Sequence, residues 1–429
     1  MGHGKFEASK EFAAALSAGD PLASYRARFH IPRMPDGTDC VYLCGHSLGL
    51  QPKSVRAAIE QELQDWERLA VEAHLHARNP WLPYHEMLAV PTAKLVGALP
   101  IEVVVMNSLT VNLHLMMVTF YRPTLERNKI LIEANAFPSD QYAVQSQIRY
   151  HGYDPATSLI EIGPRRGETS IRTEDIEERI AAEGERIALV LFGGVNYFSG
   201  QAFECARIAR AGHAKGCVVG FDMAHAAGNL PLKLHDWDAD FAVWCSYKYL
   251  NGGPGCAGGC FVHERHAHNP KLPRFAGWWG NDKQARFRMG PTFQAIPGAE
   301  GWQLSNPSIL SMAALRASMD IFDEARIERL RAKSEIQTAY LKFLLEQHPS
   351  DKFAIITPSD PAQRGAQLSL RLSKNGRTIC ERLAKRGVLC DWREPDILRA
   401  APVPLYNSFL DVFAFAENFL SAIEEDPQP

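Results

Sequence analysis

The segments Cys217-Val-Val-Gly-Phe-Asp222 and Phe241-Ala-Val-Trp-Cys245 decide the fold that we expect for this chain. Each is a short run that is apolar on both faces, which is typical of a parallel strand buried between layers of helices. Two similar runs lie upstream, at Lys129–Ala134 and Ile187–Phe192. Helical stretches fill the gaps, at Asp140–Tyr150, Thr173–Glu183 and Phe203–Lys215. This alternation predicts crossover connections and a mainly parallel sheet flanked by helices, which is an α/β fold.

The pattern changes after about residue 306. A helical region from Ile309 to Gln347 precedes short segments with the pattern of strands, and Thr378 with Glu381 forms a possible capping box for another helix. A closing helix is expected over Asp411–Glu425. The expected strands are Phe353–Thr357, Gln367–Leu372, Val388–Asp391 and Ile397–Ala400. These elements predict a small α+β domain at the C-terminus.

The N-terminal part of the chain is weakly patterned until Ser54, where Val55, Ile59, Leu63 and Trp66 recur at helical spacing. We therefore expect three parts. Residues 1–53 form an N-terminal segment that packs with the small domain, residues 54–310 form the large domain, and residues 311–429 form the small domain.

The composition excludes several classes of protein. Lys and Arg number 46 against 49 Asp and Glu, and the net charge of −3 without a basic run argues against a nucleic-acid partner. We expect no secretory signal and no membrane span, because no apolar stretch has the required length. The nine cysteines form no C-x-x-C pair, so we expect free thiols in a cytoplasmic protein.

Two residues that follow predicted strands could carry chemistry. Ligands of open α/β sheets bind outside the carboxyl ends of the strands, where Asp222 and Lys248 are expected to lie. A lysine with a pKa lowered by burial can form a Schiff base. Taken singly, the aspartate is more commonly a turn or capping residue and the lysine more commonly reaches the surface.

A third feature is Asn107-Ser-Leu-Thr-Val-Asn-Leu-His114, between an apolar run and a helical stretch. Free backbone N–H groups and hydroxyls at a helix N-terminus suit a phosphate, although Ser108 or Thr110 could simply cap the helix. A phosphate site, a strand-end aspartate and a strand-end lysine together are what pyridoxal 5′-phosphate (PLP) requires. Phe137 follows a strand and could stack on the cofactor ring; a core aromatic is the alternative.

Two other patterns are weaker. Gly253-Pro-Gly-Cys-Ala-Gly258 matches the dinucleotide-binding fingerprint, but it leads into an apolar run rather than a helix. His263-Glu-Arg-His-Ala-His268 could suggest a metal site, but it lacks the spacing of the known zinc motif. We therefore expect neither a dinucleotide nor a metal.

The sequence resembles the kynureninases, PLP-dependent hydrolases of the aspartate aminotransferase (fold type I) superfamily. The matching segments run in order along nearly the whole chain: Gly45-His-Ser-Leu-Gly-Leu-Gln-Pro52, Met106-Asn-Ser-Leu-Thr-Val-Asn-Leu-His114, Phe137-Pro-Ser-Asp140, Gly220-Phe-Asp-Met-Ala-His-Ala226, Trp244-Cys-Ser-Tyr-Lys-Tyr-Leu-Asn251, Gly277-Trp-Trp-Gly280, Ser305-Asn-Pro307 and Arg399-Ala-Ala-Pro-Val-Pro-Leu-Tyr-Asn-Ser408.

The resemblance implies a role for each matching residue. Lys248 would be the Schiff-base lysine, Asp222 would pair with the pyridinium nitrogen, and Tyr247 would transfer protons. The implied cofactor-binding set is Leu109, Thr110, Phe137, Pro138, Ser139, Asp140, Asp222, His225, Tyr247, Lys248, Trp278 and Asn306. The implied substrate-binding set is His74, Ser305, Asn306 and Arg399, with Arg399 gripping the α-carboxylate as a bidentate fork.

The resemblance also implies the reaction, hydrolysis of L-kynurenine or 3-hydroxykynurenine to L-alanine and the corresponding anthranilate. It implies a homodimer in which Trp278 and Asn306 enter the site of the partner subunit. Polar groups at residues 74, 305 and 306 would favour the 3-hydroxy substrate. His46 stands where the family usually has Asn, and Gly193 where some members have Ser.

Three other functions remain open from the sequence. A second PLP enzyme of this fold is one, such as a cysteine desulfurase or an aminotransferase. A non-catalytic scaffold of the same fold is another, and a nucleotide-binding oxidoreductase is the third. A desulfurase requires a mobile catalytic cysteine, and we find no cysteine in a suitable loop.

Overall fold

A large β-sheet forms the centre of the protein. The computed structural model describes residues 5–269 and 271–425. The strands of the large sheet are β2 (Val103–Met106), β3 (Lys129–Glu133), β4 (Leu159–Ile162), β5 (Ile187–Gly193), β6 (Val218–Asp222), β7 (Phe241–Trp244) and β8 (Gly258–Val262). Their order across the sheet is β2-β8-β7-β6-β5-β3-β4. The four expected strands are confirmed as β3, β5, β6 and β7, with bounds that shift by one residue at most at each end.

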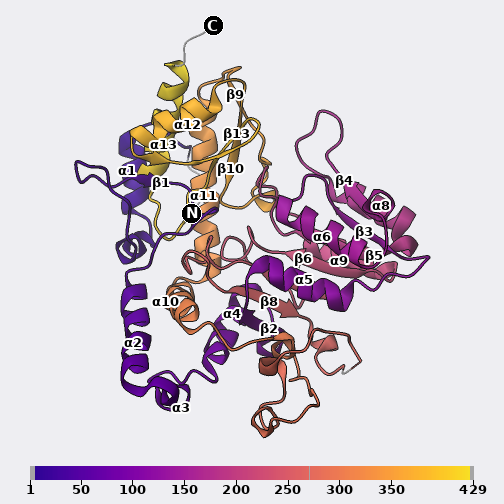
Figure 1. Cartoon of the computed structure of the whole chain (residues 1–429). Coiled ribbons are helices and arrows are strands. Elements are labelled where there is room, and N and C mark those ends of the chain that lie inside the picture. The colour runs from indigo at the N-terminus through magenta and orange to yellow at the C-terminus, as the bar shows by residue number, and fades with distance from the viewer. Residues whose placement is uncertain (1–4, 270, 426–429) are drawn as a thin grey trace.

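Helices cover both faces of this sheet (Figure 1). Alternate strand residues point to opposite sides, so that Val103 and Val105 enter one apolar cluster while Val104 and Met106 enter the other. The second cluster includes residues of α5 (Leu109–Phe120) and α6 (Pro138–Tyr150). The first cluster includes residues of α4 (Ala89–Val96), α8 (Thr173–Glu183), α9 (Cys205–Ala214) and α10 (Ile309–Ala325). Burial on both faces explains the continuous apolar runs of the sequence.

The sheet is mainly parallel, as expected, with one exception. Strand β8 runs antiparallel to both of its neighbours, β7 and β2. The segment between β7 and β8 contains no helix that could carry the chain back across the sheet, so β8 returns in the opposite direction. The same segment carries Lys248, which therefore lies where the chain reverses at the carboxyl edge of the sheet.

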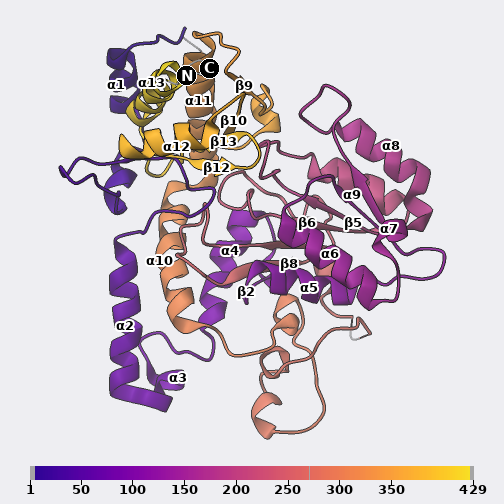
Figure 2. The same ribbon diagram turned by 45° about the horizontal axis from the view of Figure 1, so that its top comes forward.

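A second, antiparallel sheet lies in the C-terminal part of the chain (Figure 2). Its strands are β9 (Phe353–Ile355), β10 (Leu368–Leu372), β12 (Asp391–Arg393) and β13 (Ile397–Ala400), in the order β12-β13-β10-β9. Its apolar cluster includes residues of α11 (Ile327–Glu346), α12 (Gly376–Lys385) and α13 (Phe409–Glu424). This arrangement confirms the α+β character expected for the C-terminal region.

The N-terminal segment contacts this C-terminal part. Helix α1 (Lys10–Ala18) packs against α13, and β1 (Val41–Tyr42) pairs in parallel with β11 (Val388–Leu389). Helix α2 (Ser54–Leu69), expected from its apolar spacing, packs instead against α10 and leads to α3 (Ala73–His76). The domain boundaries at residues 53 and 310 stay predictions.

The helical region expected from Ile309 to Gln347 is confirmed as two helices, α10 and α11, which are separated at Arg326, where the backbone φ is 64°. The capping box expected at Thr378 and Glu381 was wrong. Thr378 does not cap α12, which begins two residues earlier, at Gly376. Helix α1, the short α7 (Pro155–Ser158) and strand β4 were not predicted, since the pattern of each is too short or too weak to identify it.

Two expectations from composition can be compared with the structure. All nine cysteines are free thiols, as expected. Among the described residues, we find no helix with the length and apolarity needed to cross a membrane.

Candidate active site

A cavity of about 200 Å³ opens at the carboxyl edge of the large sheet. It lies where β3, β5 and β6 end and where α5 and α6 begin. Its lining residues are Leu109, Thr110, Glu133, Phe137, Ser139, Asp140, Gly193, Val195, Tyr197, Asp222, Ala224, His225, Tyr247 and Lys248. The structure thus brings together nine of the residues that the sequence singled out.

Lys248 follows β7 and points toward a histidine. Its Nζ lies 3.1 Å from Nε2 of His225, 5.8 Å from the centre of the Phe137 ring and 5.7 Å from that of Tyr247. Burial and the charge of Lys248 lower the pKa of His225 well below its usual value. The imidazole is therefore neutral, and its Nε2 accepts a hydrogen bond from the lysine.

Three carboxyl groups lie close together in this cavity. Asp222 ends β6 and accepts a hydrogen bond from the backbone N–H of Ala224 at 2.7 Å, while Asp140 lies in the first turn of α6 and Glu133 ends β3. Burial raises the pKa of Asp222, and burial together with the Asp222 charge raises that of Asp140. Burial raises the pKa of Glu133 to about 7. Such a cluster is stabilised by a cation placed against it.

Another part of the cavity lining suits an anion. Ser108 is the N-cap of α5 but makes no side-chain capping hydrogen bond, so it does not take up the first N–H groups of this helix. Thr110 Oγ1 lies 2.7 Å from Ser139 Oγ, at the start of α6. Two hydroxyls and two helix N-termini therefore meet here, which is an arrangement typical of phosphate sites.

Arg399, on β13, lies beside the cavity rather than in its lining. It is 1% exposed, and its Nη1 donates to the backbone oxygen of Tyr197 at 2.8 Å. Its Nη2 lies 2.8 Å from Asp391 Oδ2 and 3.1 Å from Ser47 Oγ. The guanidinium is therefore held by the C-terminal sheet, and it contacts the cavity lining through its hydrogen bond to Tyr197.

Several residues implied by the resemblance lie elsewhere in the chain. Trp278 is partly exposed and donates its indole N–H to the backbone oxygen of Arg286, while His74 lies on α3. Ser305 and Asn306 are exposed on the segment before α10, and Pro138 occupies the first position of α6. Their proposed roles stay predictions.

The sequence analysis missed several lining residues. Glu133 could have been found, because it is a carboxyl group at the end of a predicted strand, as Asp222 is. Tyr197 carries no comparable signal, and its place depends on the loop after β5. Gly193 is close to Glu133: a Cβ atom on this glycine would lie 3.0 Å from Glu133 Oε1. A serine here would therefore require Glu133 to move.

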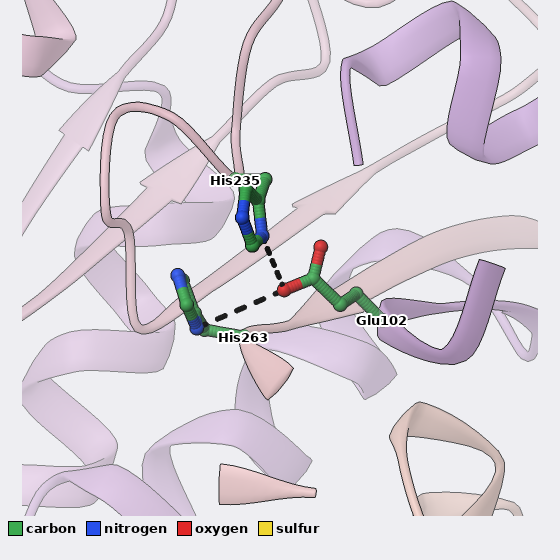
Figure 3. A group of neighbouring side chains, drawn as sticks. All are labelled: Glu102, His235 and His263. Atoms are coloured by element: carbon green, nitrogen blue, oxygen red, sulfur yellow. Dashed lines mark hydrogen bonds and ion pairs between the residues drawn. The ribbon is translucent and has the colours of Figure 1, made fainter. Parts of the chain in front are cut away.

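The two weaker motifs are also placed by the structure. The glycine-rich segment 253–258 leads into β8, so it lacks the strand–turn–helix context of a dinucleotide site. His263 lies near Glu102 and His235 (Figure 3), at the edge of the large sheet opposite the edge that carries the lysine loop. The atoms of these three residues that could bind a metal lie within 4.8 Å of one another.

Hydrogen bonds already use the atoms of this group. Glu102 Oε1 lies 2.9 Å from His235 Nδ1 and accepts the backbone N–H of Glu264 at 2.8 Å. His263 Nδ1 accepts the backbone N–H of Arg265. A metal ion would have to compete with these donors, so the geometry favours a group that holds loops together.

A related ion-pair group surrounds Asp240. Its carboxylate lies 2.9 Å from His213 Nε2, 2.8 Å from His266 Nε2 and 2.6 Å from Arg265 Nη2, and it accepts the backbone N–H of Val219. The hydrogen bond to Asp240 raises the pKa of His213. The folded state therefore favours the protonated form of this histidine.

We expect a pH-dependent loss of stability in His213→Asn. A raised pKa in the folded state gives stabilisation that is complete below the unfolded value of about 6.5 and is lost as the pH rises through the folded value. The variant should lower the melting temperature more at pH 5.5 than at pH 9. The exposed His348→Asn is the matched control, and equal losses at both pH values for His213→Asn would contradict the prediction.

Comparisons with known proteins agree with these features. The family described as the kynureninase C-terminal domain matches residues 330–419. A kynureninase from Koribacter versatilis is 64% identical over 421 residues, covering 98% of this chain and 99% of the relative. A kynureninase from Myxococcus xanthus is 61% identical over 412 residues, covering 96% and 97%.

Solved structures give the fold. The cysteine desulfurase CsdA from Escherichia coli has a TM-score of 0.75 at 18% identity, covering 94% of this chain and 98% of that one. The cystine C-S lyase C-DES, in complex with cysteine persulfide, has a TM-score of 0.75 at 16% identity, covering 90% and 99%. At such low identity the likeness concerns the fold alone.

Proposed function

The chain belongs to the kynureninase family, and from that premise we propose that the cavity around Lys248 binds PLP and hydrolyses a carbon–carbon bond of kynurenine. One observation carries the assignment of the site. A lysine, a buried carboxyl cluster and two helix N-termini converge in a single cavity. Each group suits a different part of the same cofactor.

The described residues fit PLP in three ways. The carboxyl cluster around Asp222 calls for a cation, and the pyridinium nitrogen of PLP is one. Asp140 Oδ1 is buried without a hydrogen-bond partner among the described residues, so a polar group is missing next to it. The start of α5 offers its N–H groups to the phosphate.

When bound, PLP supplies an electron sink that stabilises negative charge at the substrate Cα. In our proposal, Thr110 and Ser139 bind the phosphate and Phe137 lies against the ring. Asp222 keeps the ring nitrogen protonated, with His225 next to it. Lys248 would hold the aldehyde, and its amine would move the proton at the substrate Cα, because it is the aliphatic amine in the cavity lining.

The remaining steps concern the substrate carbonyl and carboxylate. Burial raises the pKa of Tyr247, so its phenol stays protonated at neutral pH and can donate a proton at the γ-carbonyl and at Cβ. Arg399 binds the α-carboxylate. A cysteine desulfurase would need a reactive thiol here, and the lining residues include no cysteine.

We expect Lys248→Ala to abolish the function. Without the amine, kcat should fall by roughly 10³-fold or more, because both covalent attachment and proton transfer are lost. The native protein should be yellow with PLP and retain the cofactor covalently after borohydride reduction, whereas the variant should not. Lys233→Ala, at an exposed lysine before β7, is the control. Retained turnover in Lys248→Ala would remove Lys248 from its role.

We further propose a homodimer in which Trp278 and Asn306 complete the site of the partner subunit. Both side chains are exposed and lie outside the cavity of their own chain. Exposed large apolar residues gather around the same segment, at Phe275, Trp278, Phe287 and Met289. Such a surface suits a contact between subunits.

Mixing two inactive variants tests this dimer. A dimer of one Lys248→Ala chain and one Trp278→Ala chain contains one intact site if Trp278 acts across the interface. A statistical mixture, after exchange of subunits, should therefore recover about a quarter of the native activity. No recovery, with exchange verified by mass, would show that Trp278 acts within its own chain, whereas a Trp278→Ala protein that is active by itself would show that Trp278 has no role in the site.

The preference for 3-hydroxykynurenine is the finer part of the proposal. In the assembled dimer, His74, Ser305 and Asn306 would place polar groups near the aromatic ring of the substrate. A polar pocket left without its partner penalises the substrate that lacks the hydroxyl.

The ratio of kcat/KM for the two substrates measures this preference. We expect 3-hydroxykynurenine to exceed kynurenine by about tenfold, and Asn306→Ala to reduce that ratio. Both substrates should be assayed on one PLP-saturated preparation. A clear preference for kynurenine would overturn this part of the proposal and leave the reaction itself unaffected.

A further inference from the structure

The turn between residues 44 and 49 joins the two halves of the site. On one side, Ala401, next to β13, donates its backbone N–H to the oxygen of Leu43 at 2.9 Å. On the other side, Gly49 donates to the backbone oxygen of Tyr247 at 2.8 Å. A Cβ atom on Gly49 would collide with the backbone oxygen of Lys248, so the approach is close. The turn is therefore fixed between the Arg399 strand and the lysine loop.

His46, in this turn, is a buried histidine. The residue is 0% exposed, and neither ring nitrogen has a hydrogen-bond partner among the described residues. Its Nε2 lies 3.9 Å from Oδ2 of Asp391, which is too long for a hydrogen bond. Buried polar groups are nearly always paired, so an unused donor this close to a carboxylate requires an explanation.

The charge state of His46 follows from its surroundings. Burial and the positive charges of Arg399, Arg393 and Lys248 lower its pKa well below the usual value. The ring is therefore neutral, and it carries one N–H donor and one acceptor nitrogen. A neutral donor can turn toward Asp391 without adding another positive charge beside Arg399.

The donors of Arg399 are largely committed before substrate binds. Nη1 is bound to Tyr197, and Nη2 is shared by Asp391 and Ser47, which leaves Nε as the nitrogen without a partner among the described residues. Bidentate binding of a carboxylate needs two N–H groups of the guanidinium. Both bidentate edges of the guanidinium, Nη1 with Nη2 and Nε with Nη2, include Nη2, whose two N–H groups are already committed. Arg399 must therefore release Asp391 or Ser47 from Nη2 to bind the substrate carboxylate.

Releasing Asp391 would weaken binding unless this buried carboxylate finds another donor. Ser47 Oγ and Arg393 remain in contact with it, the latter at 3.1 Å. We propose that His46 is a positioning residue that takes over the hydrogen bond of Asp391 when Arg399 binds the α-carboxylate of the substrate. This inference rests on the proposed function, because it assumes that Arg399 receives the substrate.

Ligand binding separates this role from simple packing. The probes are L-alanine, which carries the α-carboxylate, and ethylamine, which lacks it; both are titrated against the PLP-loaded protein by its visible absorbance. In His46→Leu, which fills the space but has no donor, we expect the Kd of L-alanine to rise about tenfold, as for the loss of one hydrogen bond to a charged group. The Kd of ethylamine should change less than about twofold.

Three further variants complete the design. His46→Gln keeps a donor and should bind L-alanine within about threefold of the native protein. In the Asp391→Asn background, His46→Leu should have little further effect, because the charge that needs the donor is gone. His85→Leu is the matched control, since His85 is another buried histidine without hydrogen bonds and lies outside the cavity lining. If His46→Leu does not fold, His46→Met replaces it.

The outcomes are distinct. Unchanged L-alanine binding in His46→Leu, or equal weakening for ethylamine, would overturn the inference and leave a packing role. An undiminished effect in the Asp391→Asn background would also overturn it. A native protein that neither takes up PLP nor cleaves kynurenine would instead refute the proposed function. The kinetic signature in His46→Leu should be a raised KM with kcat nearly unchanged.

Discussion

The structure depends on a half-buried lysine that lies beside carboxyl groups at the edge of the large sheet. Lys248 lies 3.1 Å from a neutral histidine, and burial raises the pKa values of Asp222 and Asp140 while the charge of Lys248 opposes this rise. None of these groups is stable alone in an apolar interior. The strands β6 and β7 must therefore end at the same edge, and the parallel order of the sheet secures this.

The C-terminal sheet adds the second charged group of the site. Arg399 is held by Asp391, on the neighbouring strand, and by the backbone of Tyr197 in the large-sheet region. The turn that carries His46 fixes the distance between this arginine and the lysine loop. The arginine that we propose for substrate binding and the proposed cofactor site are thus connected through a short N-terminal segment, by the hydrogen bonds of Leu43 and Gly49.

The sequence predicted the residues at the strand ends well, because a strand that is buried on both faces is a continuous apolar run whose end is easily recognised. Asp222 and Lys248 follow such strands, and both line the cavity. It failed at Thr378, and it did not show the break at Arg326, because the backbone conformation of single residues sets these helix boundaries. It also missed Tyr197, because a loop residue enters a cavity only through the path that its whole loop takes.

The sequence by itself determined the α/β fold, the two sheets, the family and the residues at the strand ends, since these depend on local periodicity and on motifs. Only the tertiary structure decided the antiparallel return of β8, the three-carboxyl cluster and the pairing of Arg399 with Asp391. These features join residues that are far apart in the chain. Their geometry follows from packing between distant segments. For the same reason, no local pattern in the sequence could show that the ring nitrogens of His46 are without hydrogen-bond partners among the described residues.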